Sequence, residues 1–180
     1  MSTFKKTPFM LNVRDLEGRP GEMREKDLDI TLSERMGEGL LAVQQGSTLH
    51  VDARLESVHE GILVTAEVTA VADGECGRCL REISQPVEVE FQELFAYPSE
   101  EAFDSVVEAD HVDLEPLVRD AVVLSLPFQP VCSPDCPGLD PATGERLQEN
   151  AVGAAPSDVD PRWAALAGLA ASADPDDEKH

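Results

Sequence analysis

Apolar and polar residues alternate most regularly between Thr48 and Val71. The first run has apolar residues at every second position, at Leu49, Val51, Ala53 and Leu55. After Gly61 the same period returns, at Ile62, Val64, Ala66 and Val68. A period of two is typical of a strand with one buried face, and the connection SVHEG suits an antiparallel pair. The pattern predicts a hairpin whose second strand runs into the sequence ADGECGRC.

Weaker forms of this pattern predict further strands on both sides of the hairpin. Residues 8–13 and 27–32 read as strands before it, and LLAVQQG at 40–46 fits either a strand or a loop. After the hairpin, Val87, Val89 and Phe91 alternate with acidic and amide side chains. The strands together predict an antiparallel β-sheet or a partly open barrel.

The apolar spacing becomes helical after Asp113, which is suited to cap a helix through about Ser125. Pro116 would fall in its first turn, where a missing N–H costs little, and Pro127 would end it. Five apolar residues share a predicted core-facing stripe: Leu114, Leu117, Val118, Ala121 and Leu124. The predicted fold class is therefore α+β, with one main helix packed on the sheet.

Composition changes near Gln148 to Ala, Gly, Pro, Ser and Asp, which is typical of a linker. We therefore expect a domain at 1–147 and a flexible linker and tail at 148–180. The tail sequence DPRWAALAGLAA predicts a short C-terminal helix at about 161–171. Trp163, Leu166 and Leu169 can share its face, either to bind a partner or to dock on the chain's own domain.

The formal net charge of −22 on 180 residues narrows the classes of partner. Such a surface repels phosphate backbones and acidic membranes and attracts basic partners. From Glu82 to Leu117 there is no lysine or arginine, so this stretch predicts a solvated acidic face or a docking face for a basic protein. We expect a cytoplasmic protein, since the sequence has no apolar run that fits a secretory signal or a membrane span.

The four cysteines form two pairs, Cys76 with Cys79 in ECGRC and Cys132 with Cys136 in CSPDC. These spacings let tight turns direct thiolates at one metal ion, and Gly74 and Gly77 would give the first turn conformational freedom. Because 52 residues separate the two pairs, each pair would form a turn of its own, called a cysteine knuckle below. The fold would bring the two knuckles together. We predict a structural zinc ion with four cysteine ligands; unmetallated thiols and a redox or disulfide role are the alternatives.

Catalysis is not expected. A catalytic zinc keeps an open position and usually recruits histidine or a carboxylate, whereas the four histidines of this chain lie apart in the sequence, without an HExxH motif. The motifs GxSxG, GxGxxG and the Walker loop do not occur in the sequence. We predict a protein that is not an enzyme and has no small-molecule substrate.

Several segments resemble the YceD family of large-ribosomal-RNA-subunit accumulation proteins, in its actinobacterial form. The resemblance rests on RPGEMRE, LESVHEGILVTAEV, ECGRCLREI, VEVEFQELFAYP, DLEPLVRDAVVLSLPFQPVCSPDCPGL and DPRWAALAGL. It implies a non-enzymatic factor for 23S ribosomal RNA accumulation and large-subunit assembly. It also implies that Cys76, Cys79, Cys132 and Cys136 are the metal-site positions.

One segment departs from the pattern of similar proteins. They often continue as GLCPxCG, whereas this chain has GLDPATG, with Asp140 and Thr143 at the two cysteine positions. Asp140 is then a fallback oxygen ligand. Because a protein of this charge is a poor direct binder of RNA, we expect it to act through a basic ribosomal or assembly protein. The rival hypothesis is a zinc- or thiol-dependent regulatory module unrelated to ribosomes.

Overall fold

The computed structural model describes residues 7–98 and 104–148, and everything below concerns these residues. The chain divides into two units, Met1–Pro134 and Asp135–His180. The predicted tail helix at 161–171, with Trp163, Leu166 and Leu169, lies outside the described residues. The predicted domain boundary at 147/148 and the predicted linker stay predictions for the same reason.

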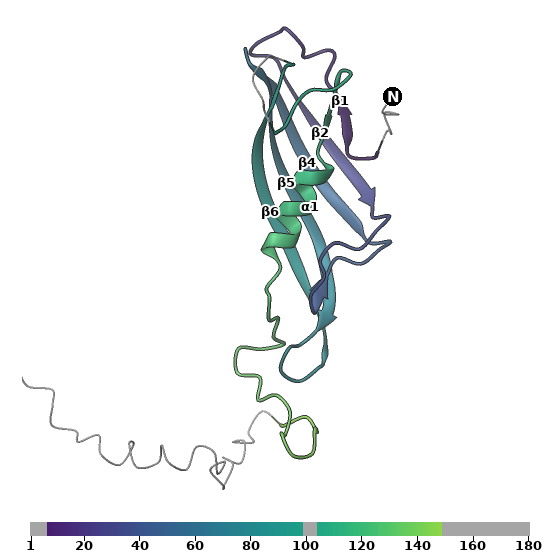
Figure 1. Ribbon diagram of the computed structural model, residues 1–180, viewed down its shortest axis with the longest axis vertical. Coiled ribbons are helices and arrows are strands. Elements are labelled where there is room, and N and C mark those ends of the chain that lie inside the picture. Colours follow the sequence, from purple (N-terminus) through teal and green to yellow (C-terminus); the bar gives the residue numbers. More distant parts are fainter. Residues whose placement is uncertain (1–6, 99–103, 149–180) are drawn as a thin grey trace, which may run out of the picture. The chain divides into compact units, whose positions relative to one another are not determined.

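The larger unit is built on an antiparallel sheet in which β4 (Thr48–Ser57), β5 (Gly61–Glu75) and β6 (Glu82–Ala96) follow one another. On the outer side of β4 lies β2 (Met23–Thr31), and β3 (Leu41–Ala42) pairs with β5 beyond the end of β4. The fold class is α+β as predicted, and the sheet is open (Figure 1). Of the two forms expected, the antiparallel sheet is therefore the one found.

The register of the sheet confirms the faces that the alternation predicts. Val51 of β4 lies opposite Val68 of β5, which lies opposite Val89 of β6. The buried face also carries Leu49, Leu55, Val64, Ala66 and Phe95, which belong to one core. This core also includes Leu11, Val118 and Val122, and burial of its apolar surface stabilises the unit.

The hairpin of β5 and β6 is paired at every residue from Gly61 opposite Ala96 to Glu75 opposite Glu82. Near its end, the backbone of residues 40–42 lies against β5. A Cβ at Gly74 would lie 1.8 Å from the carbonyl oxygen of Leu40. Gly74 does not have a positive φ, so close packing and not turn flexibility requires glycine there. This corrects the role expected from the sequence.

The helix α1 (Glu115–Ser125) occurs where it was predicted and lies against β6 (Figure 1). Its N-cap is Leu114 and not Asp113, although the Asp113 carboxylate accepts a hydrogen bond from the Glu115 N–H at 3.0 Å. Val118 and Val122 are buried. Just before the helix, β7 (His111–Asp113) pairs with β1 (Met10–Asn12) in a separate two-stranded sheet.

One residue of the predicted helical stripe is wrongly placed. Leu124 is 84% exposed, whereas Leu114, Val118 and Val122 are fully buried. At 3.6 residues per turn, Leu124 lies about 120° around the helix axis from Val118, well outside the buried face, which is centred on Val118. Among the described residues, we find no helix that combines the length and the apolar character needed to span a membrane.

Candidate metal centre

The first cysteine pair lies in the turn that joins β5 to β6. The Cys76 N–H donates to the Arg81 carbonyl at 2.8 Å, and the Leu80 N–H donates to the Cys76 carbonyl at 3.0 Å. Leu80 has a φ of 55°, the left-handed conformation that lets the chain reverse after Cys79. The long hairpin therefore ends in a narrow loop that holds Cys76 and Cys79 on its inner side, where both are buried.

The segment after α1 crosses this loop and places Cys132 beside it. The Gly77 N–H donates to the Pro130 carbonyl at 2.8 Å, and the Arg78 guanidinium donates to the Pro134 carbonyl at 3.1 Å. The Cys132 N–H points at the sulfur of Cys76, with N and Sγ 3.4 Å apart. These three hydrogen bonds connect the two cysteine knuckles independently of any bound ion.

The four cysteine sulfurs converge, because the ligand atoms of Cys76, Cys79, Cys132 and Cys136 all lie within 4.8 Å of one another. The sulfurs of Cys79 and Cys132 are 3.7 Å apart. Four sulfurs around zinc at about 2.3 Å would be about 3.8 Å from one another in a tetrahedron. All four cysteines are free thiols, so this donor set fits a zinc ion of the structural class. Such an ion would supply a bond between the two knuckles.

The surroundings of Cys76 favour its thiolate. Burial acts to raise the pKa of the Cys76 thiol, but hydrogen bonds from the backbone N–H groups of Arg78, Cys79 and Cys132 and from the Cys79 side chain oppose it. Their combined effect lowers the pKa from 9.0 to about 6. Because metals bind the thiolate form, this network preorganises a metal ligand.

Asp140 has a role within its own turn. Its carboxylate accepts hydrogen bonds from the N–H groups of Ala142 and Thr143, at 2.8 and 3.0 Å. These bonds lower the pKa of the Asp140 carboxyl group. Among the described residues, the group able to hold a metal consists of the four cysteines alone. The geometry of Asp140 is that of a turn-forming residue, in place of the fallback ligand expected from the sequence.

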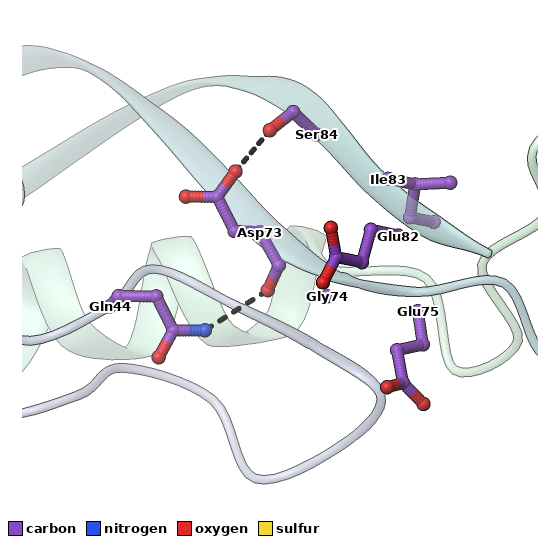
Figure 2. A pocket seen from close by; sticks show the side chains of 7 residues that line it. All are labelled: Gln44, Asp73, Gly74, Glu75, Glu82, Ile83 and Ser84. Carbon is purple, nitrogen blue, oxygen red and sulfur yellow. Dashed lines mark hydrogen bonds between the residues drawn. The ribbon is translucent and has the colours of Figure 1, made fainter. Parts of the chain in front are cut away.

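An acidic pocket of about 640 Å³ borders the first knuckle. Its carboxylates come from Asp73 and Glu75 at the end of β5 and from Glu82 at the start of β6 (Figure 2). The Ser84 hydroxyl hydrogen-bonds the Asp73 carboxylate, and the Gln44 side-chain amide donates to the Asp73 carbonyl at 3.1 Å. Sequence reasoning did not identify this pocket, because only the register of the hairpin brings Asp73 opposite Ser84.

The structure brings together the four cysteines that the sequence singled out, and their identity as metal ligands stays a prediction. The hydrogen bond from the Cys132 N–H to the Cys76 sulfur was missed, since it depends on how residues 130–132 cross the turn. The described histidines lie elsewhere: His50, for example, pairs with Asp29 across β4 and β2, with Nδ1 and Oδ1 2.5 Å apart. Within the described residues, the group that could hold a metal contains no histidine.

Comparisons with known proteins match this chain to one family and to several bacterial proteins. The family model described as large ribosomal RNA subunit accumulation protein YceD matches residues 64–170. An uncharacterized protein of Mycobacterium tuberculosis strain H37Rv is 44% identical over 168 residues, which cover 89% of this chain and 80% of that protein. An uncharacterized protein of Mycobacterium leprae is 35% identical, covering 92% of this chain and 79% of the relative.

A more distant relative is the uncharacterized protein YlbN of Bacillus subtilis. It is 31% identical over 96 residues, which cover 51% of this chain and 56% of that protein. No solved structure matches the chain.

Proposed function

We propose that this chain, which belongs to the YceD family of large ribosomal RNA subunit accumulation proteins, supports the accumulation of 23S ribosomal RNA in the bacterial cytoplasm. The observation that carries the proposal is the family match over residues 64–170. That range contains most of the long hairpin, all of α1 and both cysteine pairs. The role is that of a binding factor and not of an enzyme.

Zinc has a structural role in this proposal. With four cysteine ligands the ion has no open position for a substrate or a reactive water. It would tie the end of the hairpin to the segment after α1, where a hydrogen bond already connects Gly77 with Pro130. The fold has its own core, so zinc would fix this end of the unit and would not be needed for the sheet itself.

The solvent face of the sheet suggests the chemistry of the partner. Asp27, Asp52, Glu67 and Glu90 lie opposite one another on β2, β4, β5 and β6. All four are exposed, and none of them takes part in an ion pair found among the described residues. Like charges opposite one another destabilise a sheet, so this row, referred to below as the carboxylate row, favours a cationic partner.

A basic protein segment fits this face better than RNA does. Adjacent strands are about 4.8 Å apart, so the carboxylate row extends about 14 Å across the sheet and could accept several lysine or arginine side chains. Phosphate groups would be repelled by the same row. We therefore propose that the chain acts through a basic ribosomal or assembly protein, bound before that protein joins the large subunit.

Depletion of the protein in a bacterium that encodes it tests the proposed role. We expect less 23S than 16S ribosomal RNA and fewer large subunits, both restored by the wild-type gene. Unchanged subunit profiles would contradict the proposal and favour a zinc- or thiol-dependent regulatory module.

The partner is tested separately by crosslinking and co-purification. If ribosomal RNA is still recovered with this chain after its protein partners have been removed, the chain binds RNA directly, which would contradict action through a protein.

A further inference from the structure

One of the four cysteines differs from the others in its access to solvent. Cys76, Cys79 and Cys136 are 0, 4 and 5% exposed, whereas Cys132 is partly exposed. Oxidation of cysteines by small reagents follows exposure and thiolate character. Cys76 has thiolate character but is fully buried, so a peroxide from solvent reaches the partly exposed Cys132 more readily than the other three cysteines.

The sulfur beside Cys132 is placed to react with its oxidation product. The sulfurs of Cys79 and Cys132 are 3.7 Å apart, so they have about 1.7 Å to close before reaching the length of a disulfide. The sulfur of Cys76 is constrained differently. It accepts hydrogen bonds from the N–H groups of Arg78 and Cys132, both at 3.4 Å, and its movement into a disulfide would break these bonds.

We propose that Cys132 is a peroxide-sensitive modification site and that its oxidation ends in a disulfide between Cys79 and Cys132. Hydrogen peroxide oxidises the Cys132 thiol to a sulfenic acid and is itself reduced to water. The Cys79 thiol then attacks the Cys132 sulfur, forming the S–S bond and releasing the sulfenic oxygen as a second water. In total, two thiols and one peroxide give one disulfide and two waters.

This disulfide would join the same two segments as a zinc ion would, but it excludes the ion. It consumes one thiolate from each knuckle and leaves Cys76 and Cys136, too few ligands for a structural zinc site. The oxidised chain would thus keep the hairpin end and the segment after α1 connected while releasing metal. A disulfide within one knuckle, such as Cys76 with Cys79, would leave the two segments without a covalent link.

Peptide mapping of the full-length protein tests the assignment. The protein is purified under reducing conditions without chelator, treated with hydrogen peroxide, alkylated and digested with trypsin and endoproteinase Asp-N. Cleavage after Arg78 and Arg81 and before Asp135 places each cysteine on its own peptide. We expect a crosslinked peptide that joins 79–81 to 120–134, with loss of two of the four free thiols.

Two serine variants, each lacking one of the four thiols, separate the roles of the sulfurs. In Cys79→Ser we expect the sulfenic acid at Cys132 to persist and to be trapped by dimedone. In Cys136→Ser, the matched control, the Cys79–Cys132 crosslink should still form. The proposal is overturned if the wild-type digest shows mainly Cys76–Cys79 or Cys132–Cys136 pairing, or if Cys132 is oxidised without a crosslink. The wild-type map decides even where a variant does not fold.

Discussion

Cys76 shows how a single residue is prepared for its chemistry by its backbone surroundings. Its sulfur is fully buried, yet N–H groups from both cysteine knuckles point at it. A buried thiolate would otherwise be unfavourable, because charged groups are costly to remove from water. Donors from residues 78 and 132 compensate for that cost, and they connect the two knuckles at the same time. The same hydrogen bonds therefore stabilise the predicted metal ligand and hold the two segments in contact.

The first prediction at this scale concerns metal content. Protein purified without chelator should hold one zinc ion per chain, measured by elemental analysis. Cys76→Ser and Cys132→Ser should each lose it, because the sulfurs of both knuckles share one site. Asp140→Ala is the matched control, since this carboxylate caps its own turn, and it should retain full zinc. Wild-type protein without metal would contradict the site.

The second prediction concerns pH. In the metal-free chain, the pKa of the Cys76 thiol is lowered from 9.0 to about 6. Thiolate absorbance at 240 nm should therefore rise with a midpoint near pH 6 in folded protein, and this step should vanish in Cys76→Ser. Between pH 6 and 9 the unfolded chain binds more protons than the folded chain, so stability should rise with pH in this window and be lost as pH falls through 6. A single thiolate step near pH 9 would contradict the assignment.

At the scale of elements, the sequence predicts strands best where only one face of the strand is buried. The alternation at 48–55 and 61–68 identified β4 and β5 together with their buried faces, because a period of two leaves little freedom of register. Leu124 was wrongly assigned to the buried face. It lies at the edge of the predicted apolar stripe, and the sequence alone does not show whether another element covers a residue there. The reason for Gly74 was also hidden, because it depends on residue 40 passing against β5.

Helix α1 offers a direct test of the corrected stripe. Val122 is fully buried and Leu124 is 84% exposed. Val122→Ala should lower the free energy of unfolding by about 1.5–3 kcal/mol through lost burial and a residual cavity, whereas Leu124→Ala should change it by less than about 0.5 kcal/mol. Urea unfolding followed by circular dichroism measures both. Equal effects of the two substitutions would contradict the observed helix orientation.

Gly74 provides the test for the end of the hairpin. In Gly74→Ala the added methyl group would meet the Leu40 carbonyl oxygen. We therefore expect the free energy of unfolding to fall by about 1–3 kcal/mol. Gly39→Ala is the control, because a Cβ there meets nothing within 4 Å and the backbone does not have a positive φ. In thermal unfolding, the midpoint temperature of Gly74→Ala should be well below that of the wild type, and that of Gly39→Ala should be close to it.

The charge of −22 acquires a pattern only at the scale of the whole unit. The sequence places acidic residues in several segments, but the carboxylate row exists because the registers of four strands bring them into line. Nothing local in the sequence distinguishes Glu67 or Asp52 from other exposed acidic residues. The sequence could therefore predict a preference for basic partners, but not where such a partner would bind.

Glu67 lies in an inner position of this row, and Glu67→Lys should have two opposite effects. Relief of repulsion from Asp52 and Glu90 should stabilise the fold by about 0.2–1 kcal/mol. Binding of a lysine-rich peptide, measured by fluorescence anisotropy at low salt, should weaken. Glu38→Lys makes the same change of charge on an exposed loop residue and should weaken binding less. Equal weakening by both variants would show that net charge alone, and not the row, attracts the peptide.

The pairing of β1 with β7 constrains the order in which a newly made chain can fold. Leu11 lies opposite Val112, so β1, once synthesised, must wait for about a hundred further residues before its partner exists. The hairpins of β2, β4, β5 and β6 join neighbouring segments and can form while translation continues. Until residue 113 has been made, Phe9, Leu11 and Val13 lack their final cover. A chain interrupted before that point would thus display an apolar N-terminal segment, the kind of feature by which chaperones and proteases recognise unfinished proteins.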